Sequence, residues 1–561
     1  MRPFRRLFFL AALYVLTLGV FALAGSRPAE AARDELVIGI IQYPSTLHPS
    51  IDTMLAKTYV VRLAHRPLTT YDADWKLICM LCVTLPTIEN GLAKREKTTE
   101  GKDGIAVTYT IQPNARWGDG VPVSTDDVMF SWEVGKNPKS GVAAGELYRR
   151  ILSIDVKDAK TFTLHFDRVS FDYNAINDFE VLPAHIEREA FSDPARYRNR
   201  THYDTDSTNP GLWFGPYRVV DKEPGSQIVL ERNPTWWGPV PAFKRITVRV
   251  VENTAALEAN LLSGSIDMVA GELGLSLDQA IAFEKRHGHQ FNVISKPGLV
   301  YEHLDLNLDN PILADLRVRR ALLLALDRDV INDQLYGSRQ PPAPTFVSPL
   351  DWIYDSDIKA VQQDLVAARQ LLDEAGWRMG PDGVRINAKG ERLAFDLMTT
   401  AGNRSRELVQ QVIQSQWKAV GIEARIRNQP ARVLFGDTLQ KRKFQGLAMF
   451  AWMSAPESVP RSILHSSEIP SSQNNFSGEN FVGFHSPEVD QLLDKIETTI
   501  DRDARKTLWF RLQRIYAEQL PAIPLFFRAD AYILPKWLTG VVPTGHQEPT
   551  TEWVETWGVR P

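Results

Sequence analysis

The residues with the clearest capacity for chemistry are the two cysteines, the two histidines of a His-Gly-His sequence and a large number of carboxylates. Cys79 and Cys82 are the only cysteines in the 561 residues, and they stand in a C-x-x-C spacing. A redox or metal centre would need a second ligand pair or a thioredoxin-like strand-helix context, and neither is visible. In an oxidising compartment the two thiols could form a local disulfide, and otherwise they would pack as small apolar residues. Both interpretations remain open from the sequence.

His287-Gly288-His289 could chelate a metal in principle, but it follows Glu284-Lys285-Arg286 in a polar stretch and has no third ligand nearby. We interpret it as a solvated helix end. The sequence contains no G-x-S-x-G elbow, no P-loop and no H-E-x-x-H. Asp and Glu number 68 in total and could supply a carboxylate pair after folding, so the sequence alone does not exclude an enzyme. We expect no catalytic residue, no metal and no cofactor.

The run from Tyr109 to Trp132 predicts a strand, a tight turn and a capped helix, in that order. Val107, Tyr109 and Ile111 alternate with polar residues, which is the period of a half-buried strand. Asp119-Gly120 indicates a turn, because Gly tolerates positive φ and Asp bonds its own backbone. Ser124, with Asp127 three residues later, can cap a helix whose apolar face carries Val128 and Trp132.

Helical and strand patterns alternate along the rest of the chain, which predicts an α/β fold. The strands are expected at Leu36–Ile41, Ile266–Ala270 and Ile422–Ile426, and the helices at Asn253–Leu262, Val318–Leu326 and Leu408–Val420. Asn90–Gly104 is polar and Gly-bounded, and we expect a solvated hairpin loop there.

Short motifs in the sequence indicate a family more specifically than the hydrophobic periodicity does. The stretch ARWGDGVPVSTDDVMFSW resembles the signature of the family 5 extracellular solute-binding proteins, the periplasmic receptors of peptide and nickel ABC transporters. Further matches follow in the family's order and span roughly Glu35 to Gly540: Gly215-Pro216-Tyr217, Leu230–Pro234, Asp315–Ala321, Leu371–Trp377 and Ala522–Leu525. One such match would be weak evidence, whereas five in order are strong evidence.

The resemblance implies a two-lobed periplasmic-binding-protein fold of type II, in the large peptide-receptor class with an extra subdomain. The mature chain also exceeds the size at which one hydrophobic core stops growing. We expect a signal peptide at 1–31. Lobe I would comprise 32–297 and about 525–561, with the extra subdomain at about 75–185, and lobe II would comprise 298–524.

The implied function is that of a periplasmic receptor that binds an oligopeptide or peptide-like solute between closing lobes and delivers it to an inner-membrane ABC permease. Alternatives within the class are a receptor for nickel chelate, haem or an apolar non-peptide solute. A different class would be a secreted enzyme or a membrane-anchored interaction protein. The formal net charge of −4 and the absence of a basic stripe argue against nucleic acid. We expect a monomer.

In the peptide receptors that this chain resembles, an acidic residue just after a Trp-x-x pattern neutralises the ligand amine. The matching stretch here, Ala451 to Pro460, keeps Trp452 and contains Ser454, but Ala455 stands where that Asp would be. Either Glu457 substitutes, or the amine stays wet, or the ligand has no such amine, because a buried unpaired ammonium is costly.

Five further residues are candidates for the ligand cleft. Tyr43 lies in a loop after the first strand, and Tyr301 lies near the expected crossover between the lobes. Trp213 and Phe214 replace smaller residues of the family pattern and could offer stacking faces, or could equally be core residues. Arg404 could clamp a carboxylate, although a lone Arg at a helix start is more often solvated.

The first 31 residues have the pattern of a secretory signal peptide. Arg2, Arg5 and Arg6 precede an apolar run from Leu7 to Ala24, and Ala29-Glu30-Ala31 is a small-residue cleavage site. The leader contains no cysteine for lipoprotein attachment, so we expect a periplasmic protein. The alternative is an uncleaved anchor, because the apolar run approaches the length of a membrane span.

Overall fold

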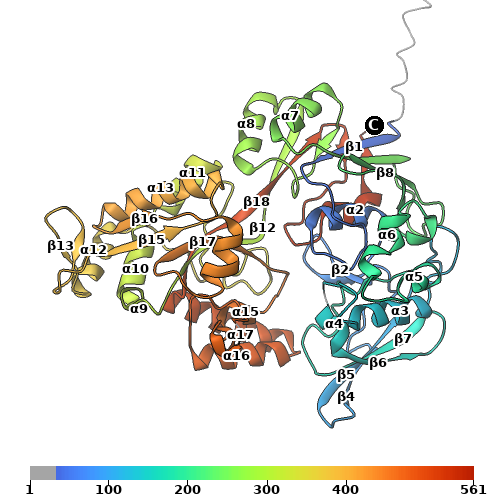
Figure 1. Ribbon diagram of the computed structural model, residues 1–561, viewed down its shortest axis with the longest axis horizontal. Helices are drawn as coiled ribbons and strands as arrows, with labels where there is room; N and C mark the ends of the chain where they lie inside the picture. The colour runs from blue at the N-terminus through green and yellow to red at the C-terminus, as the bar shows by residue number, and fades with distance from the viewer. Residues whose placement is uncertain (1–32, 144, 475, 561) are drawn as a thin grey trace, which may run out of the picture.

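The structure, a computed structural model, describes residues 33–143, 145–474 and 476–560, so the expected leader lies outside it. Two lobes are joined by two long strands, β12 (Phe291–Leu306) and β18 (Ala522–Pro535) (Figure 1). These strands pair antiparallel from Phe291↔Pro535 to Asp305↔Ala522, and the register shifts between Pro297 and Tyr301 and again between Glu302 and His303. The two irregularities lie where the chain passes from one lobe to the other, which is where a hinge is needed.

One ten-stranded sheet runs through both lobes, with β12 and β18 at its centre. On the lobe II side of this pair lie β17 (Leu447–Met453), β15 (Ala394–Met398) and β16 (Glu423–Ile426). On the lobe I side lie β11 (Met268–Val269), β1 (Glu35–Ile40), β10 (Arg245–Val250), β9 (Gln227–Arg232) and β8 (Tyr217–Glu223).

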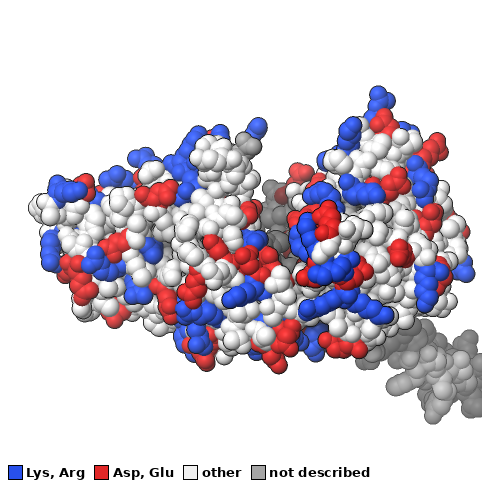
Figure 2. All heavy atoms as spheres, turned by 90° about the horizontal axis from the view of Figure 1, so that it is seen from below, with Lys and Arg blue, Asp and Glu red and all other residues white. Residues whose placement is uncertain are grey.

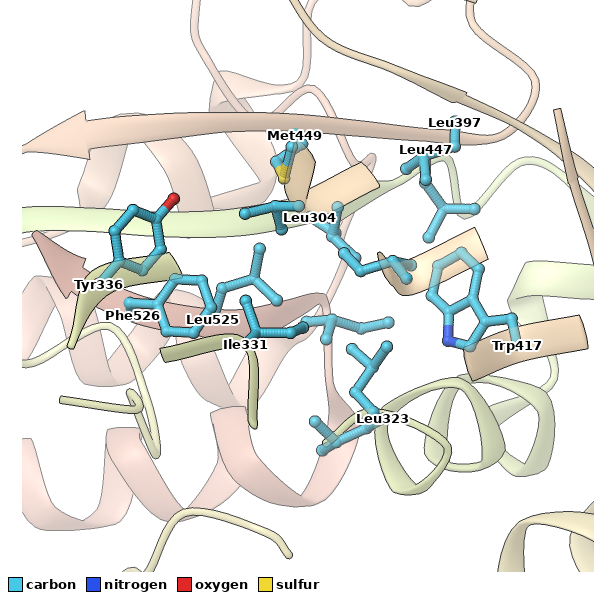
Figure 3. Close-up of a cluster of buried hydrophobic side chains, with 14 of the residues drawn as sticks. Leu304, Leu323, Ile331, Tyr336, Leu397, Trp417, Leu447, Met449, Leu525 and Phe526 are labelled. Atoms are coloured by element: carbon cyan, nitrogen blue, oxygen red, sulfur yellow. The ribbon is translucent and has the colours of Figure 1, made fainter. Parts of the chain in front are cut away.

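Helices cover both faces of this sheet and bury its apolar side chains. The first face carries α7 (Thr254–Ser263), α8 (Leu277–His287), α10 (Leu316–Leu324), α11 (Arg328–Tyr336), α12 (Leu365–Glu374) and α13 (Arg404–Lys418). Figure 3 shows how Leu304, Met449 and Phe526 of the sheet meet Ile331 and Trp417 of these helices. The second face carries α2 (Leu55–Ala64) in lobe I and α15 (Arg461–Leu464), α16 (Pro487–Thr498) and α17 (Arg502–Gln519) in lobe II.

A separate four-stranded sheet with its own core forms a subdomain next to lobe I. Its order is β4 (Ala93–Lys97), β5 (Asp103–Thr110), β7 (Thr161–Phe166) and β6 (Ile151–Val156), and α3 (Thr125–Lys136) packs against it. Asp127 holds this unit together, since its carboxylate accepts hydrogen bonds from Trp117 Nε1 at 3.2 Å and from the Ala184 amide at 2.9 Å. The signature stretch therefore builds the subdomain's interior.

Smaller elements lie within and between these units. They are β2 (Thr69–Tyr71), β3 (Leu77–Cys79), β13 (Arg378–Met379), β14 (Arg385–Ile386), β19 (Leu538–Thr539) and β20 (Gly558–Val559), with short helices α4 (Gly145–Arg150), α5 (Ala184–Ala190), α6 (His202–Thr205), α9 (Pro311–Ala314) and α14 (Ala431–Val433).

Most of the expected elements are confirmed, with bounds shifted by a few residues. The strand, the turn and the cap of the signature stretch are present: Gly120 has φ +94°, and Ser124 with Asp127 forms a capping box. The interpretation of Asn90–Gly104 as a loop was wrong for 93–97 and for 103–104, because β4 and the start of β5 pair there. Cys79 and Cys82 form a disulfide. The domain bounds remain a prediction, and both expected crossovers fall inside β12 and β18.

Replacing Ser124 by Ala is expected to lower the free energy of unfolding by about 1 kcal/mol. The substitution removes the acceptor for the Asp126 amide and half of the capping box, so orphan donors remain at the start of α3. Chemical denaturation followed by circular dichroism measures the change. Ser124→Asp, which keeps an acceptor at the cap, serves as control, and an equal loss in both variants would contradict the capping role.

Within the described residues, no helix is both long and apolar enough to cross a membrane.

Candidate functional site

Strand β12 has a cavity on each of its two faces. Successive side chains of a strand point to opposite sides of the sheet, and Tyr301 lines a cavity on one side while Glu302 lines a cavity on the other. We call the first the Trp452 pocket and the second the back cavity. Different helices close these two cavities.

The Trp452 pocket has a volume of 120 Å³ and is built mainly by lobe II. Its aromatic wall comes from four elements: Tyr301 on β12, Trp452 at the end of β17, Trp509 on α17, and the loop that carries Phe346. The Tyr301 and Tyr516 hydroxyls hydrogen-bond at 3.0 Å, which fixes the first of these rings. Such a wall offers aromatic faces to one group of a ligand.

Two polar troughs continue from this pocket toward lobe I. The Asp172 trough, of 420 Å³, shares Ala455 and Ser458 with the Trp452 pocket. The Lys57 trough, of 340 Å³, shares Met453 with it. We call the pocket and the two troughs together the interlobe cleft. Acidic and basic side chains border the hollow between the lobes (Figure 2).

Segment 453–459 follows β17 into the cleft and is held by a buried ion pair. Glu457 is paired with the Arg505 guanidinium, and their side chains are 13% and 7% exposed. The same carboxylate accepts a hydrogen bond from Trp352 Nε1 at 3.0 Å, and the Glu457 amide donates to Asp351 Oδ2 at 2.7 Å. Arg505 also donates to two backbone carbonyls at the end of α16. The Glu457 charge is therefore already compensated within lobe II.

The floor of the Lys57 trough is a buried network of charges. The Arg62 guanidinium contacts Glu180 at 2.9 Å and Glu548 at 3.5 Å, and Glu552 at 3.7 Å. Burial acts to lower the Arg62 pKa, but Glu180, Glu548 and Glu552 together raise it. Burial acts to raise the Glu180 pKa, but Arg62 and then His65 hold it below its usual range. The network joins α2 to the C-terminal segment.

Lys57 and Asp178 face the same trough. Burial lowers the Lys57 pKa to about 8, although its Nζ donates to the Pro49 carbonyl at 2.5 Å. Burial, followed by Glu180, raises the pKa of Asp178. Among the described residues Asp178 has no ion-pair or hydrogen-bond partner for its carboxylate, so it is available to a ligand.

The back cavity, of 550 Å³, lies between α8 of lobe I and the α11 and α13 helices of lobe II. Glu302 and Arg406 form an ion pair within it, at 2.5 and 3.2 Å. In its wall, Glu272 accepts a hydrogen bond from the Thr550 amide at 2.9 Å, while its second oxygen is buried without a partner in the described chain. Burial raises the Glu272 pKa to about 7.

Four of the eight predicted site residues come together at the interlobe cleft. Tyr301, Trp452 and Ser454 line the Trp452 pocket, and Glu457 lines the Asp172 trough. Their assignment to a ligand remains a proposal. The idea that Glu457 takes over the role of the absent acid at Ala455 is not supported by this geometry, because Arg505 already occupies its carboxylate.

The other four lie elsewhere, and two of them are core residues. Trp213 and Phe214 are 0% exposed, with Trp213 Nε1 bonded to the Ser207 carbonyl and Phe214 packed against Trp117. The expectation that they offer stacking faces to a ligand is corrected here, because the bulk that replaces the family's smaller residue fills the lobe I and subdomain cores.

Tyr43 and Arg404 also lie outside the Trp452 pocket and its two troughs. Tyr43 is half-buried against the lobe I core. Arg404 is exposed at the start of α13, and its neighbour Arg406 provides the guanidinium that reaches the back cavity. Arg406 reaches the cavity and Arg404 does not, because residues two positions apart point to different sides of a helix.

Sequence reasoning missed the remaining polar and aromatic walls of the Trp452 pocket. Asp351, Glu479, Phe346 and Trp509 come from three distant segments, and none stands in a pattern that marks it. Asp351 follows a Ser-Pro-Leu turn, where an acidic residue is ordinary. Only the packing of α17 and the two loops around β12 brings them together.

The comparisons with known proteins agree with this architecture. The model for bacterial extracellular solute-binding proteins, family 5 Middle, matches residues 87–471. The chain belongs to this family. The match covers the subdomain, much of lobe I and most of lobe II, so membership in the family does not rest on the signature stretch alone.

Relatives of this family-5 chain cover nearly its whole length. The oligopeptide-binding protein AppA of Bacillus subtilis is 25% identical over 552 residues, covering 95% of each chain. The oligopeptide binding protein of Thermus thermophilus, solved with a pentapeptide, is 29% identical, with a TM-score of 0.70 over 94% of this chain and 96% of that one. NikZ of Campylobacter jejuni, solved with Ni(L-His), is 22% identical, with a TM-score of 0.71 over 94% and 99%. The last likeness shows the fold alone.

Among the residues that the structure describes, no group of three or more His, Cys, Asp or Glu side chains is arranged to hold a metal ion. His287 ends α8 and Gly288 follows as its C-cap, as expected for a helix end.

Proposed function

We propose that this family-5 protein is the periplasmic receptor of an ABC importer and binds an oligopeptide or peptide-like solute in the interlobe cleft. The observation that carries the proposal is an open sheet edge. β12 pairs with β17 as far as Met453, whereas β15 pairs with β17 only at Leu447 and Ala448. Beyond these residues, no described strand occupies the far edge of β17.

An extended peptide can add to such an edge through backbone hydrogen bonds, which give affinity without dependence on side-chain identity. The end of β17 is exposed to the cleft, since Met453 is 64% exposed and Trp452 is half-buried. The Trp452 pocket then receives one ligand side chain, and the two troughs receive the rest. Closure at the irregular part of β12 and β18 would enclose the ligand.

The peptide-binding relatives support this function. The receptor would work as a monomer, deliver its solute to an inner-membrane permease and perform no reaction. Native mass spectrometry of protein purified from its own periplasm identifies a co-purified ligand directly. Hydrolysis of a candidate peptide by the purified protein would contradict the receptor function.

Replacing Trp452 by Ala is expected to weaken peptide binding at least tenfold while leaving the far-ultraviolet circular dichroism unchanged. Large aromatic side chains at the centre of a binding surface commonly carry about 2 kcal/mol or more of its energy, and Trp452 lines the pocket beside the open edge. Isothermal titration calorimetry with a peptide that binds the wild-type protein measures the change in the dissociation constant.

Trp537→Ala is the matched control, because Trp537 is also half-buried but lies beyond the end of β18 in lobe I. Its binding constant should stay within twofold of the wild type. Unchanged affinity in Trp452→Ala would remove this residue from the site.

A further inference from the structure

The Trp452 pocket has an unbalanced set of charges. Asp351 and Glu479 both line it, and none of its lining residues, all of which the structure describes, is Lys, Arg or His. The other polar groups of its lining residues are neutral: the hydroxyls of Tyr301, Ser348, Ser454, Ser458 and Ser462, and the indole N–H groups of Trp452 and Trp509. A pocket with two carboxylates and no base is expected to favour a positive charge.

Neither carboxylate is neutralised by a neighbour in the described chain. Asp351, 6% exposed, accepts the Glu457 amide at 2.7 Å and the Ile353 amide at a long 3.4 Å. Glu479 accepts the Ser462 hydroxyl at 2.8 Å. These donors are neutral, and a carboxylate has room for about four hydrogen bonds. Both groups therefore keep acceptor capacity.

The Arg505 guanidinium is already engaged by other groups. Arg505 is paired with Glu457, and its Nη1 donates to the Thr499 and Ile500 carbonyls. Burial accordingly raises the pKa of Asp351 to about 6. Burying an unpaired carboxylate is unfavourable, and a ligand cation would supply the missing partner.

Size and shape restrict what can enter. The volume of 120 Å³ is well below the roughly 300–1,000 Å³ of a pocket that encloses a drug-sized molecule. The pocket therefore admits one group of the ligand while the remainder occupies the troughs. Trp452, Trp509 and Phe346 supply aromatic surfaces, which attract an ammonium or guanidinium.

We propose that the Trp452 pocket selects a cationic group of the ligand, an ammonium or guanidinium, which Asp351 and Glu479 bind beside Trp452. The inference rests on the proposed function, since it names the class of peptide-like solute that the receptor takes. It also explains how Ala455 can stand where related receptors carry an acid: the negative charge comes from two other segments. The cation is either a basic side chain or the terminal ammonium.

Calorimetric titration with a set of tetrapeptides tests this. Each is tetra-alanine with one position changed to Lys, Arg, norleucine or Glu, and each is made with a free and with an acetylated N-terminus. If a side chain is the cation, Lys or Arg at one position binds at least tenfold more tightly than norleucine there, with or without acetylation. If the terminus is the cation, acetylation costs at least tenfold at every sequence. Either result supports the proposal.

Two variants link the preference to the pocket. Asp351→Asn and Glu479→Gln keep hydrogen-bond acceptors while removing charge, and each should reduce the cation preference at least fivefold. Glu189→Gln, at an exposed position of α5, is the matched control and should keep the full preference. Using two separate variants keeps the test valid if one of them does not fold, which thermal unfolding reports.

Failure of the inference and failure of the proposed function give different results in this experiment. Peptides that bind with no preference for a positive charge, or with a preference that survives in both variants, overturn the inference but leave the receptor function standing. If no peptide of the set binds to the folded protein, the proposed peptide receptor is itself wrong, and the inference fails with it.

Discussion

Replacing Arg62 by Met is expected to lower the free energy of unfolding by about 3–5 kcal/mol, the usual cost of removing one partner from a buried ion pair. Arg62 is 5% exposed and is the guanidinium that Glu180, Glu548 and Glu552 share. The substitution leaves these carboxylates buried, with His65 at 3.1 Å from Glu180 and the Gln547 side-chain amide at 3.5 Å from Glu548 as neighbours. Urea unfolding at pH 7, followed by tryptophan fluorescence, measures the loss.

Two further variants separate charge from packing. Arg62→Lys keeps the charge but not the two-pronged contact with Glu180, so its loss should be intermediate. Adding Glu180→Leu to Arg62→Met should recover part of the stability, because one stranded charge is then removed. A loss below about 1 kcal/mol in Arg62→Met, the value typical of an exposed ion pair, would show that the network is not buried as described.

Glu272→Gln is expected to stabilise the protein at neutral pH and to have little effect in acid. The Glu272 carboxyl has a pKa of about 7 in the folded protein against an ordinary value of 4.5, because it is buried. The folded state thus favours the protonated form. The stability that this form contributes is fully present below pH 4.5 and is lost as the pH rises through about 7.

The variant cannot ionise, so its free energy of unfolding should exceed the wild type by up to about 3 kcal/mol above pH 7, at about 1.4 kcal/mol for each pKa unit. Asp351, whose pKa burial also raises to about 6, is present in both proteins and cancels in the difference. The charge of Asp530 contributes to the raised pKa of Glu272, so the titration of Asp530 is coupled to that of Glu272 and is part of the measured difference. Urea unfolding at pH 4, 5.5, 7 and 8 gives this difference. Glu518→Gln, on the exposed side of α17, should show none, and a flat difference for Glu272→Gln would contradict the raised pKa.

The signature stretch allowed much of the local structure to be predicted from the sequence. Alternation around Tyr109, the Asp119-Gly120 turn and the Ser124 cap all depend on interactions within about ten residues, and all are present. The same is true of α7, which begins at the Asn253 cap and ends at Gly264 in the left-handed region. The failure at 93–97 has the opposite cause, because the polar strand β4 is specified by its partner β5 and not by its own pattern.

The candidate site was predicted less well. Trp452 was predicted because it stands in a stretch that resembles a known family, and in the fold it pairs directly with Tyr301 across β17 and β12. For Trp213 and Phe214 the sequence left a ligand-facing role and a core role equally open, because an aromatic side chain has the same sequence appearance in a core and in a cleft. Which of the two it is depends on what packs against it, and for Phe214 that includes His65 and Trp117 from distant segments.

The family, the α/β class and the capped and turn-bounded elements could all be predicted from the sequence, because they follow from short-range order and from motifs that recur in one family. Which charged side chains lack an ion-pair partner, by contrast, depends on the tertiary structure. Glu457 and Asp351 are equally acidic in the sequence, but Arg505 neutralises the first and no described cation neutralises the second. Electrostatic balance in a buried pocket depends on distances between segments far apart in the chain, and only folding sets those distances.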